Sequence, residues 1–341
     1  MSSIKDVAEA AGVSLSTASI VANGKGKERK ISEATQEKVL NAMRDLNYIP
    51  NVSAKSLRRG ESQSYIVALF WNFDYRSTMM HRFLFGLQKR IIETNSNMSI
   101  VIHPYQTGNL KKEEQSFMNG EFHAAIIANA NSDDLDFLRS SSFLVPVVLY
   151  NRLLEGYCSV NVDDRNIGKL AAEHLHHQGY RRPAVIHGTQ NFPGATMREE
   201  GFFERMEEFG IELPANRIIY TGSSIKGGYE CGKLLLNNPV ESLADCYFCS
   251  SDFIALGLLN AWAETGQDLI PKKIGVMAMG NHDPQFSKYH SPSLTVINMP
   301  IEEMAEQCCQ FLIDRMFTLQ YQPSVQFFDT VLYARDSTRR Q

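Results

Sequence analysis

Four small hydroxyl side chains fall within six residues near the N-terminus, in the segment SLSTASIVANG: Ser14, Ser16, Thr17 and Ser19. Hydroxyl groups donate hydrogen bonds to phosphate oxygens, and their small size lets a helix approach a nucleic-acid groove closely. Serine and threonine are also mediocre helix formers that often occupy solvent-facing positions. The spacing therefore indicates a helix that contacts phosphates and base edges, with an ordinary polar helix face as the alternative.

Two short predicted helices position these hydroxyls. Apolar residues recur at helical spacing over residues 4–11, Ser3 is a suitable N-cap, and Gly12 supplies a left-handed backbone that ends the helix. Ser14 is expected to cap a second helix, LSTASIVAN, which an Asn-Gly pair ends. Two short helices joined by a tight glycine turn form a helix-turn-helix unit.

A third predicted helix, EATQEKVLNAMRDLNY, follows an N-cap at Ser32. Its apolar residues form one stripe, made of Val39, Leu40, Met43 and Leu46. Three helices of this size bury little area, but enough for a small domain.

A short basic segment, YIPNVSAKSLRRG, comes after the third helix. Pro50 ends that helix and Asn51 can cap a new one, but about two turns are too short to be stable alone in water. An exposed Leu57 flanked by Lys55 and Arg58 suits a segment that folds on docking and inserts an apolar wedge into a minor groove. A simple interdomain linker is the alternative.

Charge is unevenly distributed along the 341 residues. Residues 1–60 carry ten Lys and Arg against six Asp and Glu, whereas the remaining residues carry 24 against 32. A basic N-terminal segment, or head, on an otherwise acidic chain predicts that only the head binds a polyanion. The length is too great for one ordinary core, so two or three domains are expected.

Other features limit the class of protein. The sequence contains no run of eighteen apolar residues, which a membrane-spanning helix would need. The N-terminus lacks the pattern of a signal peptide, so we expect a cytoplasmic protein. The six cysteines fit that compartment. The pairs Cys246/Cys249 and Cys308/Cys309 are interpreted as inert core thiols, and no spacing predicts a metal or cofactor site.

From about residue 62, predicted strands and helices alternate, which indicates parallel sheets covered on both faces. Two doubly wound lobes are expected, with a ligand bound between them at the carboxyl ends of the strands. The predicted strands are SYIVALFW, MSIVIHPY, HAAIIANA, VPVVLYN, RPAVIHG, NRIIY, CYFCSS, KIGVMAMG and SLTVINMP, followed by C-terminal strands.

The segments IKDVAEAAGVSLSTASIVANG and ISEATQEKVLNAMRDLNYIPNVSAKSL resemble the lactose-repressor family of bacterial transcription regulators. The resemblance implies a homodimer on a pseudo-palindromic operator, with the second helix in the major groove and paired hinge helices in the minor groove. It assigns base-edge contacts to Leu15, Ser16 and Ile20, phosphate contacts to Ser14, Thr17, Ser19 and Asn23, further DNA contacts to Lys25, Asn51, Ala54 and Lys55, and kinking of the central step to Leu57.

Downstream, VPVVLYNR, NIGKLAAEHLHHQGYRRPAVI, SSDFIALGLLNAW and SPSLTVINMP resemble the family's effector domain. The expected fold is an all-α helix-turn-helix head plus an α/β two-lobed effector domain of the type I periplasmic-binding-protein kind, with three crossings between lobes. The expected boundaries are a head at 1–49, a hinge at 50–61 and an effector domain at 62–341, with one lobe at 62–161 plus 292–323 and the other at 162–291 plus 324–341.

The resemblance implies a repressor of a carbohydrate-utilisation operon that responds to a sugar or sugar derivative. The expected effector contacts are Phe73, Tyr75, Asn129, Asn151, Arg198, Ser251, Asp252 and His282. Alternatives are a surface charge for Arg198, a helix cap for Asp252, packing for His282 and a core role for the aromatic residues after the first strand, Trp71 among them.

Three positions depart from the family's usual lining: Asn151, Ser251 and His282 replace carboxylate or amide side chains. A neutral sugar, an acidic or phosphorylated sugar, and a larger glycoside therefore all stay open. A transport-type solute-binding protein would share the lobes but not the basic head. An enzyme would need an acid–base pair, a nucleophile with its base or a metal cluster, and the nine histidines are scattered.

Ile20 generates a prediction about the operator, because many family members carry an arginine at this position. Isoleucine favours thymine methyl groups and forgoes a bidentate guanine contact, which is worth about 1–3 kcal/mol of discrimination. We predict an A·T-rich step where Ile20 lies, while the basic loop KGKERK adds phosphate contacts and a steeper salt dependence. Selection from random DNA tests this, and a required guanine at that step would contradict it.

Overall fold

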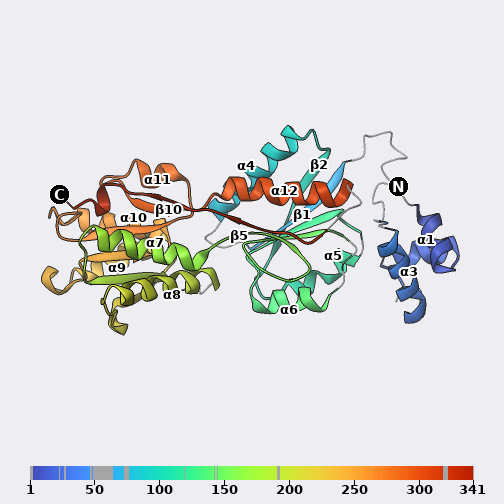
Figure 1. Cartoon of the computed structure of the whole chain (residues 1–341), viewed down its shortest axis with the longest axis horizontal. Helices are drawn as coiled ribbons and strands as arrows, with labels where there is room; N and C mark the ends of the chain where they lie inside the picture. Colours follow the sequence, from blue (N-terminus) through green and yellow to red (C-terminus); the bar gives the residue numbers. More distant parts are fainter. Residues whose placement is uncertain are drawn as a thin grey trace. The chain divides into compact units, whose positions relative to one another are not determined.

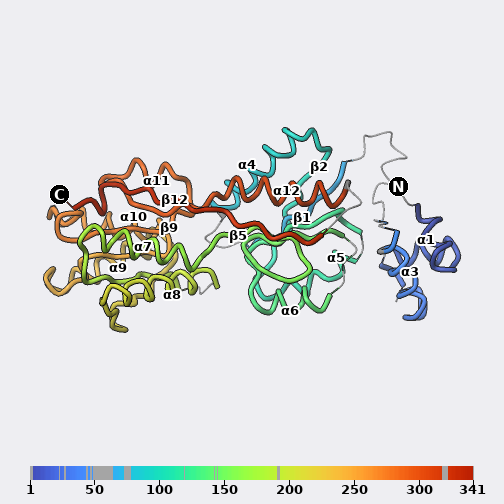
Figure 2. The backbone as a smooth tube through the Cα atoms, viewed as in Figure 1, coloured from blue at the N-terminus to red at the C-terminus, as the bar shows by residue number. Residues whose placement is uncertain are grey.

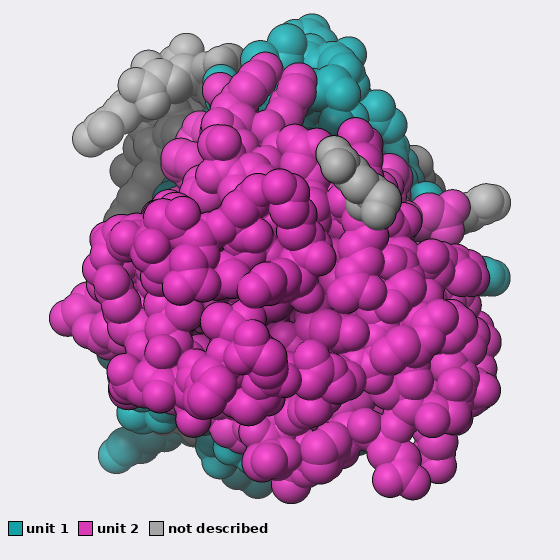
Figure 3. Space-filling model, turned by 90° about the vertical axis from the view of Figure 1, so that its left-hand side faces the viewer, with its two compact units in different colours: residues 1–74, 83–161, 302–326 teal, residues 75–82, 162–301, 327–341 magenta. Residues whose placement is uncertain are grey.

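The computed structural model describes residues 3–22, 24–26, 28–46, 48, 64–72, 77–118, 120–141, 143, 145–189, 193–317 and 322–340. The chain falls into two compact units (Figure 3). Unit 1 comprises residues 1–74, 83–161 and 302–326, and unit 2 comprises residues 75–82, 162–301 and 327–341. Unit 1 therefore contains the helical head and one β-sheet, and unit 2 contains a second β-sheet.

Three helices form the head, as the sequence predicts: α1 (Ile4–Ala11), α2 (Leu15–Ala22) and α3 (Glu33–Asp45) (Figure 1). Ser3 caps α1, because its Oγ accepts a hydrogen bond from the Asp6 amide at 3.3 Å, and Gly12 ends it at φ +63°. The head's small core consists of Val7, Ala8, Ala18, Val21, Ala22, Val39, Ala42 and Met43. Alanine and valine predominate in it, which lets these short helices pack closely.

The first sheet has the strand order β11-β5-β4-β3-β1-β2. Its strands are β1 (Tyr65–Asn72), β2 (Met98–Tyr105), β3 (Ala124–Ala128), β4 (Val147–Tyr150), β5 (Cys158–Val162) and β11 (Val325–Phe328). Strands β1 to β5 pair in parallel, as predicted. The sequence did not predict β5, because Ser159 and Asn161 interrupt its apolar pattern; both are buried, and the Asn161 amide donates to Ser159 Oγ at 2.9 Å.

The second sheet has the strand order β12-β10-β9-β8-β6-β7. Its strands are β6 (Pro183–Gly188), β7 (Ile218–Thr221), β8 (Cys246–Cys249), β9 (Gly275–Gly280), β10 (Thr295–Asn298) and β12 (Val331–Tyr333). Strands β6 to β10 pair in parallel, and β12 runs antiparallel to β10. The carboxyl ends of β6 to β10 consequently lie along one edge of the sheet.

In unit 1, helices cover both faces of the sheet (Figure 1). The helices α4 (Ser77–Glu93) and α12 (Ile301–Phe317) lie side by side on one face, and Lys89 Nζ pairs with Glu306 Oε1 at 2.7 Å between them. The helices α5 (Glu114–Met118) and α6 (Ser132–Ser140) cover the other face, and the 3-10 helix η3 (Leu110–Glu113) directly precedes α5. Within the described part of the chain, no helix is long and apolar enough to cross a membrane.

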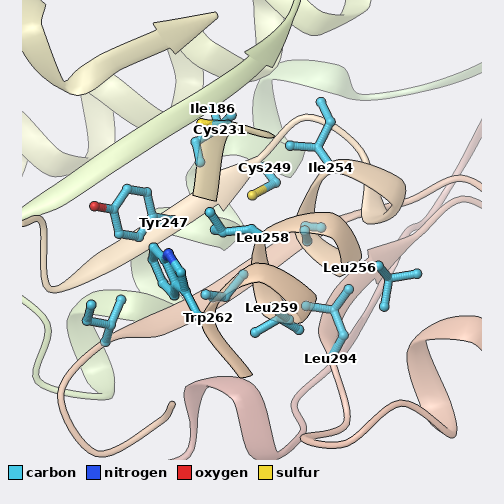
Figure 4. Close-up of a cluster of buried hydrophobic side chains, with 14 of the residues drawn as sticks. Ile186, Cys231, Tyr247, Cys249, Ile254, Leu256, Leu258, Leu259, Trp262 and Leu294 are labelled. Atoms are coloured by element: carbon cyan, nitrogen blue, oxygen red, sulfur yellow. The ribbon is translucent and has the colours of Figure 1, made fainter. Parts of the chain in front are cut away.

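In unit 2, α7 (Asp164–His177) packs with α8 (Pro193–Glu208), and α9 (Ile225–Leu235) packs with α10 (Asp252–Ala263). On the α9–α10 face, the ring of Trp262 packs edge-to-face on that of Tyr247, with 5.4 Å between the ring centroids (Figure 4). On the opposite face, Phe202 of α8 stacks on Phe248 at 5.2 Å. Shorter helices complete the unit: η4 (Ala215–Arg217), η5 (Val240–Ser242), α11 (Pro284–Lys288) and η6 (Asp336–Thr338).

The predicted lobe boundary at residue 292 differs from the structure. Residues 292–323 were assigned with the first sheet, but β10 pairs with β9 and β12 in the second. The apolar sequence pattern of a strand is the same whichever sheet it joins, so only its pairing with neighbouring strands shows to which sheet it belongs. The chain passes to the second sheet after β5, returns between β10 and β11, and passes again before β12 (Figure 2), which gives the three expected crossings.

All six cysteines are free and buried, so the pairs Cys246/Cys249 and Cys308/Cys309 lie in the core, as predicted. Burial disfavours the charged thiolate. It raises the pKa of Cys231 to about 11 and that of Cys309 to about 12, and it also raises the pKa of Cys246, Cys249 and Cys308 well above the usual range of a thiol. Thiols of this kind are poor nucleophiles and poor metal ligands.

The α9–α10 contact depends on Gly228, where a Cβ atom would overlap the main-chain oxygen of Ile254. We predict that Gly228→Ala lowers the free energy of unfolding by about 1–3 kcal/mol, because the helices must separate. Gly222→Ala is the matched control, since a Cβ there meets its nearest atom at an ordinary 3.6 Å. Urea unfolding monitored by circular dichroism measures both, and equal midpoints would show that the helices adjust without cost.

Candidate functional site

Polar residues gather at the carboxyl edge of the second sheet. Ser251 and Asp252 follow β8, Asn281 and His282 follow β9, and all four are at most 9% exposed. Parallel strands end at the same edge, so residues about thirty positions apart become neighbours. The structure thus brings together three of the predicted effector contacts, Ser251, Asp252 and His282.

Asp252 and His282 form a buried hydrogen-bonded pair. The Asp252 Oδ1 atom contacts His282 Nδ1, and Oδ2 accepts from the His282 amide at 3.1 Å. The imidazole ring stacks on Phe253 with 3.5 Å between ring centroids. Asp252 therefore does more than cap α10; Ser251 is the N-cap residue, with its Oγ accepting from the Phe253 amide at 3.2 Å.

Arg198 is held by a carboxylate from the neighbouring helix. Its Nη2 lies 2.6 Å from Asp164 Oδ1, and its Nε donates to the same oxygen at 2.7 Å. The two side chains are only 12% and 7% exposed, so the alternative of a surface helix charge is wrong. Arg198 Nη2 also lies 3.8 Å from Met299 Sδ, just beyond the end of β10.

Two further groups at this edge were missed by sequence reasoning. Arg82 of α4 is buried and donates to the main-chain oxygens of His282 at 3.4 Å and Met299 at 3.2 Å. His187, at the end of β6, lies 2.9 Å from Glu199 of α8. The available signals were an arginine within the apolar run HRFLF and a histidine at the end of a predicted strand.

Several buried polar atoms at this edge have no hydrogen-bond partner among the described residues. They include Ser223 Oγ after β7, Asn281 Oδ1 and His282 Nε2. Native proteins pair nearly all buried polar groups, so each exception needs an explanation. Those at the carboxyl edge of the second sheet are available to pair with a polar ligand.

The first sheet also presents amides at its carboxyl edge. Asn129 follows β3 and Asn151 follows β4, and both adopt left-handed backbone conformations, at φ +66° and +51°. Asparagine tolerates this region better than most residues. Trp71 is fully buried against Phe83 and Tyr150 and has the core role that the sequence left open. Phe73 and Tyr75 lie outside the described residues.

On the head, α2 buries Ala18, Val21 and Ala22 and presents the predicted contact residues outward. Ser14, Leu15 and Ser16 are exposed, with Leu15 at 52%, while Thr17, Ser19 and Ile20 are half-buried. Ser14 Oγ lies 2.9 Å from Ser16 Oγ and 2.8 Å from Thr17 Oγ1, so the hydroxyls form one cluster at the start of the helix. Lys25 is exposed in the following turn. Other predicted DNA contacts lie outside the described residues: Asn23, Asn51, Ala54, Lys55 and Leu57.

Comparison with known proteins extends these observations. A family model for bacterial regulatory proteins of the lacI family matches residues 3–51, and a model for periplasmic binding protein-like domains matches residues 172–338. The match at the head excludes the alternative of a transport solute-binding protein.

A solved LacI family transcription regulator from Clostridium acetobutylicum is 33% identical, with a TM-score of 0.75, over 80% of this chain and 100% of that chain. The HTH-type transcriptional repressor PurR of Haemophilus influenzae is 28% identical over 93% of this chain and 91% of its own length. The ribose operon repressor of Escherichia coli is 25% identical over 94% of this chain and 96% of its own length.

The buried pair of Arg198 and Asp164 yields a stability prediction. Asp164→Ala should lower the free energy of unfolding by about 3 kcal/mol, because it leaves a largely buried guanidinium without its carboxylate. Glu204→Ala is the control: Arg165 lowers the pKa of Glu204 to about 2, but this pair is open to water and its removal should leave the unfolding midpoint unchanged. Equal shifts in both variants would contradict the distinction.

Proposed function

This chain belongs to the lacI family of bacterial regulatory proteins, and we propose that it represses a carbohydrate-utilisation operon as a homodimer. In this proposal its affinity for operator DNA is switched by a small sugar or sugar derivative. The observation that carries it is a helix-turn-helix head whose second helix exposes a hydroxyl cluster and Leu15. A protein of this function acts where chromosomal DNA lies, so we place it in the cytoplasm.

We assign the DNA-reading surface to α2. Its buried side fixes the helix on the head, while Ser16 and Leu15 stay exposed and Ile20 half-exposed for the major groove. Hydroxyls of Ser14, Thr17 and Ser19 supply short phosphate contacts. Asn23 and Lys25 extend the phosphate contacts beyond the helix. Two copies of the head then read the half-sites of a pseudo-palindrome.

The hinge is proposed at residues 50–61, between a head at 1–49 and an effector domain from residue 62. In it, Asn51, Ala54, Lys55 and Leu57 would contact the minor groove. A leucine inserted between base steps unstacks them and bends the duplex. Effector binding acts on this element by favouring one of two states of the dimer, so the sugar changes operator affinity only through its different affinity for those states.

For the effector we propose the contacts Arg198, Ser251, Asp252 and His282 from unit 2 and Asn129 and Asn151 from unit 1, with Phe73 and Tyr75. Guanidinium, hydroxyl, imidazole and amide groups match the many hydroxyls of a carbohydrate. The name of the ribose operon repressor, a relative across nearly the whole chain, supports this ligand class. The buried polar atoms that lack partners at the carboxyl edge of the second sheet support it independently.

The DNA-binding surface is tested by Ser16→Ala. Loss of one hydrogen bond to a base edge or phosphate should weaken binding to DNA selected from a random pool by about tenfold. Asn41→Ala, on the exposed side of α3, is the matched control and should bind as the parent chain does. Fluorescence anisotropy at fixed salt measures both, and full affinity of the Ser16 variant would remove this residue from the interface.

The effector site is tested by Arg198→Ala in isothermal titration against a panel of sugars and sugar phosphates. The variant should lose binding of the tightest ligand and the ligand's effect on DNA affinity, while ligand-free DNA binding persists. An unchanged dissociation constant would show that the pocket lies elsewhere.

A further inference from the structure

The imidazole of His282 has contacts on two sides, and one of its ring nitrogens lacks a hydrogen-bond partner among the described residues. Its side chain has no exposure to solvent; Nδ1 contacts Asp252 Oδ1, and the Phe253 ring covers one face. The other nitrogen, Nε2, is buried and has no hydrogen-bond partner among the described residues. A buried polar atom left without a partner is unfavourable by about 1–3 kcal/mol, so this atom requires a group that pairs with it.

Asp252 determines which ring nitrogen carries the proton. Its carboxylate accepts from the Phe253 amide at 3.0 Å and the His282 amide at 3.1 Å, and the Ser251 hydroxyl lies within 3.4 Å. Donors around a carboxylate favour its ionised form. Because an ionised carboxylate only accepts, Nδ1 must donate to it, and Nε2 of the neutral ring is left with a lone pair.

We propose that Asp252 and His282 act as a relay that presents Nε2 as a hydrogen-bond acceptor for a hydroxyl of the effector, an inference that rests on the proposed effector function. The Asp252 carboxylate is occupied by its own donors, so its proposed contact with the effector is narrowed to an indirect one through the His282 ring. The group recognised at this position is then a neutral hydroxyl, because a carboxylate or phosphate would face a lone pair. The relay thereby selects neutral sugars over acidic ones at this position.

Isothermal titration with D-ribose, D-glucose, D-galactose and cellobiose, and with the corresponding uronic acids and sugar phosphates, tests the proposal at pH 7.5. The tightest ligand should be neutral. His282→Asn keeps a donor for Asp252 but lacks Nε2, and should lose at least tenfold in affinity for that ligand. His282→Gln, which places an amide near Nε2, should recover part of the affinity. An acidic sugar as the tightest ligand, or wild-type affinity in the asparagine variant, overturns the proposal.

Nitrogen-15 NMR of the histidine-labelled, ligand-free protein tests the tautomer directly, without any effector. The expected result is a neutral His282 ring protonated at Nδ1. A ring protonated at Nε2 overturns the relay and leaves the regulator function intact. Failure of every sugar to bind refutes the carbohydrate effector and the relay together, so the two failures are distinguishable.

Discussion

The parallel hydrogen-bond ladder from β6 to β10 is the constraint on which the candidate effector site depends. Its register pairs Cys249 with Ala278 and Gly280 with Asn298, so successive strands end at nearly the same level. Asp252 and His282 become neighbours for this reason, although thirty residues separate them in the chain. Without the ladder these side chains would have no common edge.

Burial of charge gives this edge its fixed arrangement. Arg198 lies against Asp164, and Asp252 against His282, with little solvent at any of the four. Buried ion pairs contribute little net stability, because desolvation offsets their attraction, but removing one partner is strongly unfavourable. Within each pair, one side chain therefore fixes the orientation of the other. The edge presents donors and acceptors that need no reorganisation when a polar ligand binds.

The head follows a different physical rule. Its core is made almost entirely of small side chains, and the informative residues are those that it leaves outside. An exposed Leu15 beside a hydroxyl cluster has little value for folding, yet it matches the apolar and polar features of a DNA groove. In the head, specificity resides in exposed positions on a rigid helix, whereas in unit 2 the candidate site is built from buried pairs.

The sequence alone determined the local structure, because capping and burial act through neighbouring residues. Helix α1 begins after Ser3 and ends at Gly12, and α2 begins after Ser14. Apolar runs predict nearly every strand. Only the tertiary structure decided that β5 is a strand despite Ser159 and Asn161, and that β10 joins the second sheet, because strand pairing is a long-range choice. The same holds for the partners of Arg198 and His282 and for the presence of Arg82 at the site. Spacing in a chain predicts which side chains reach an edge, but the fold determines which charges meet there.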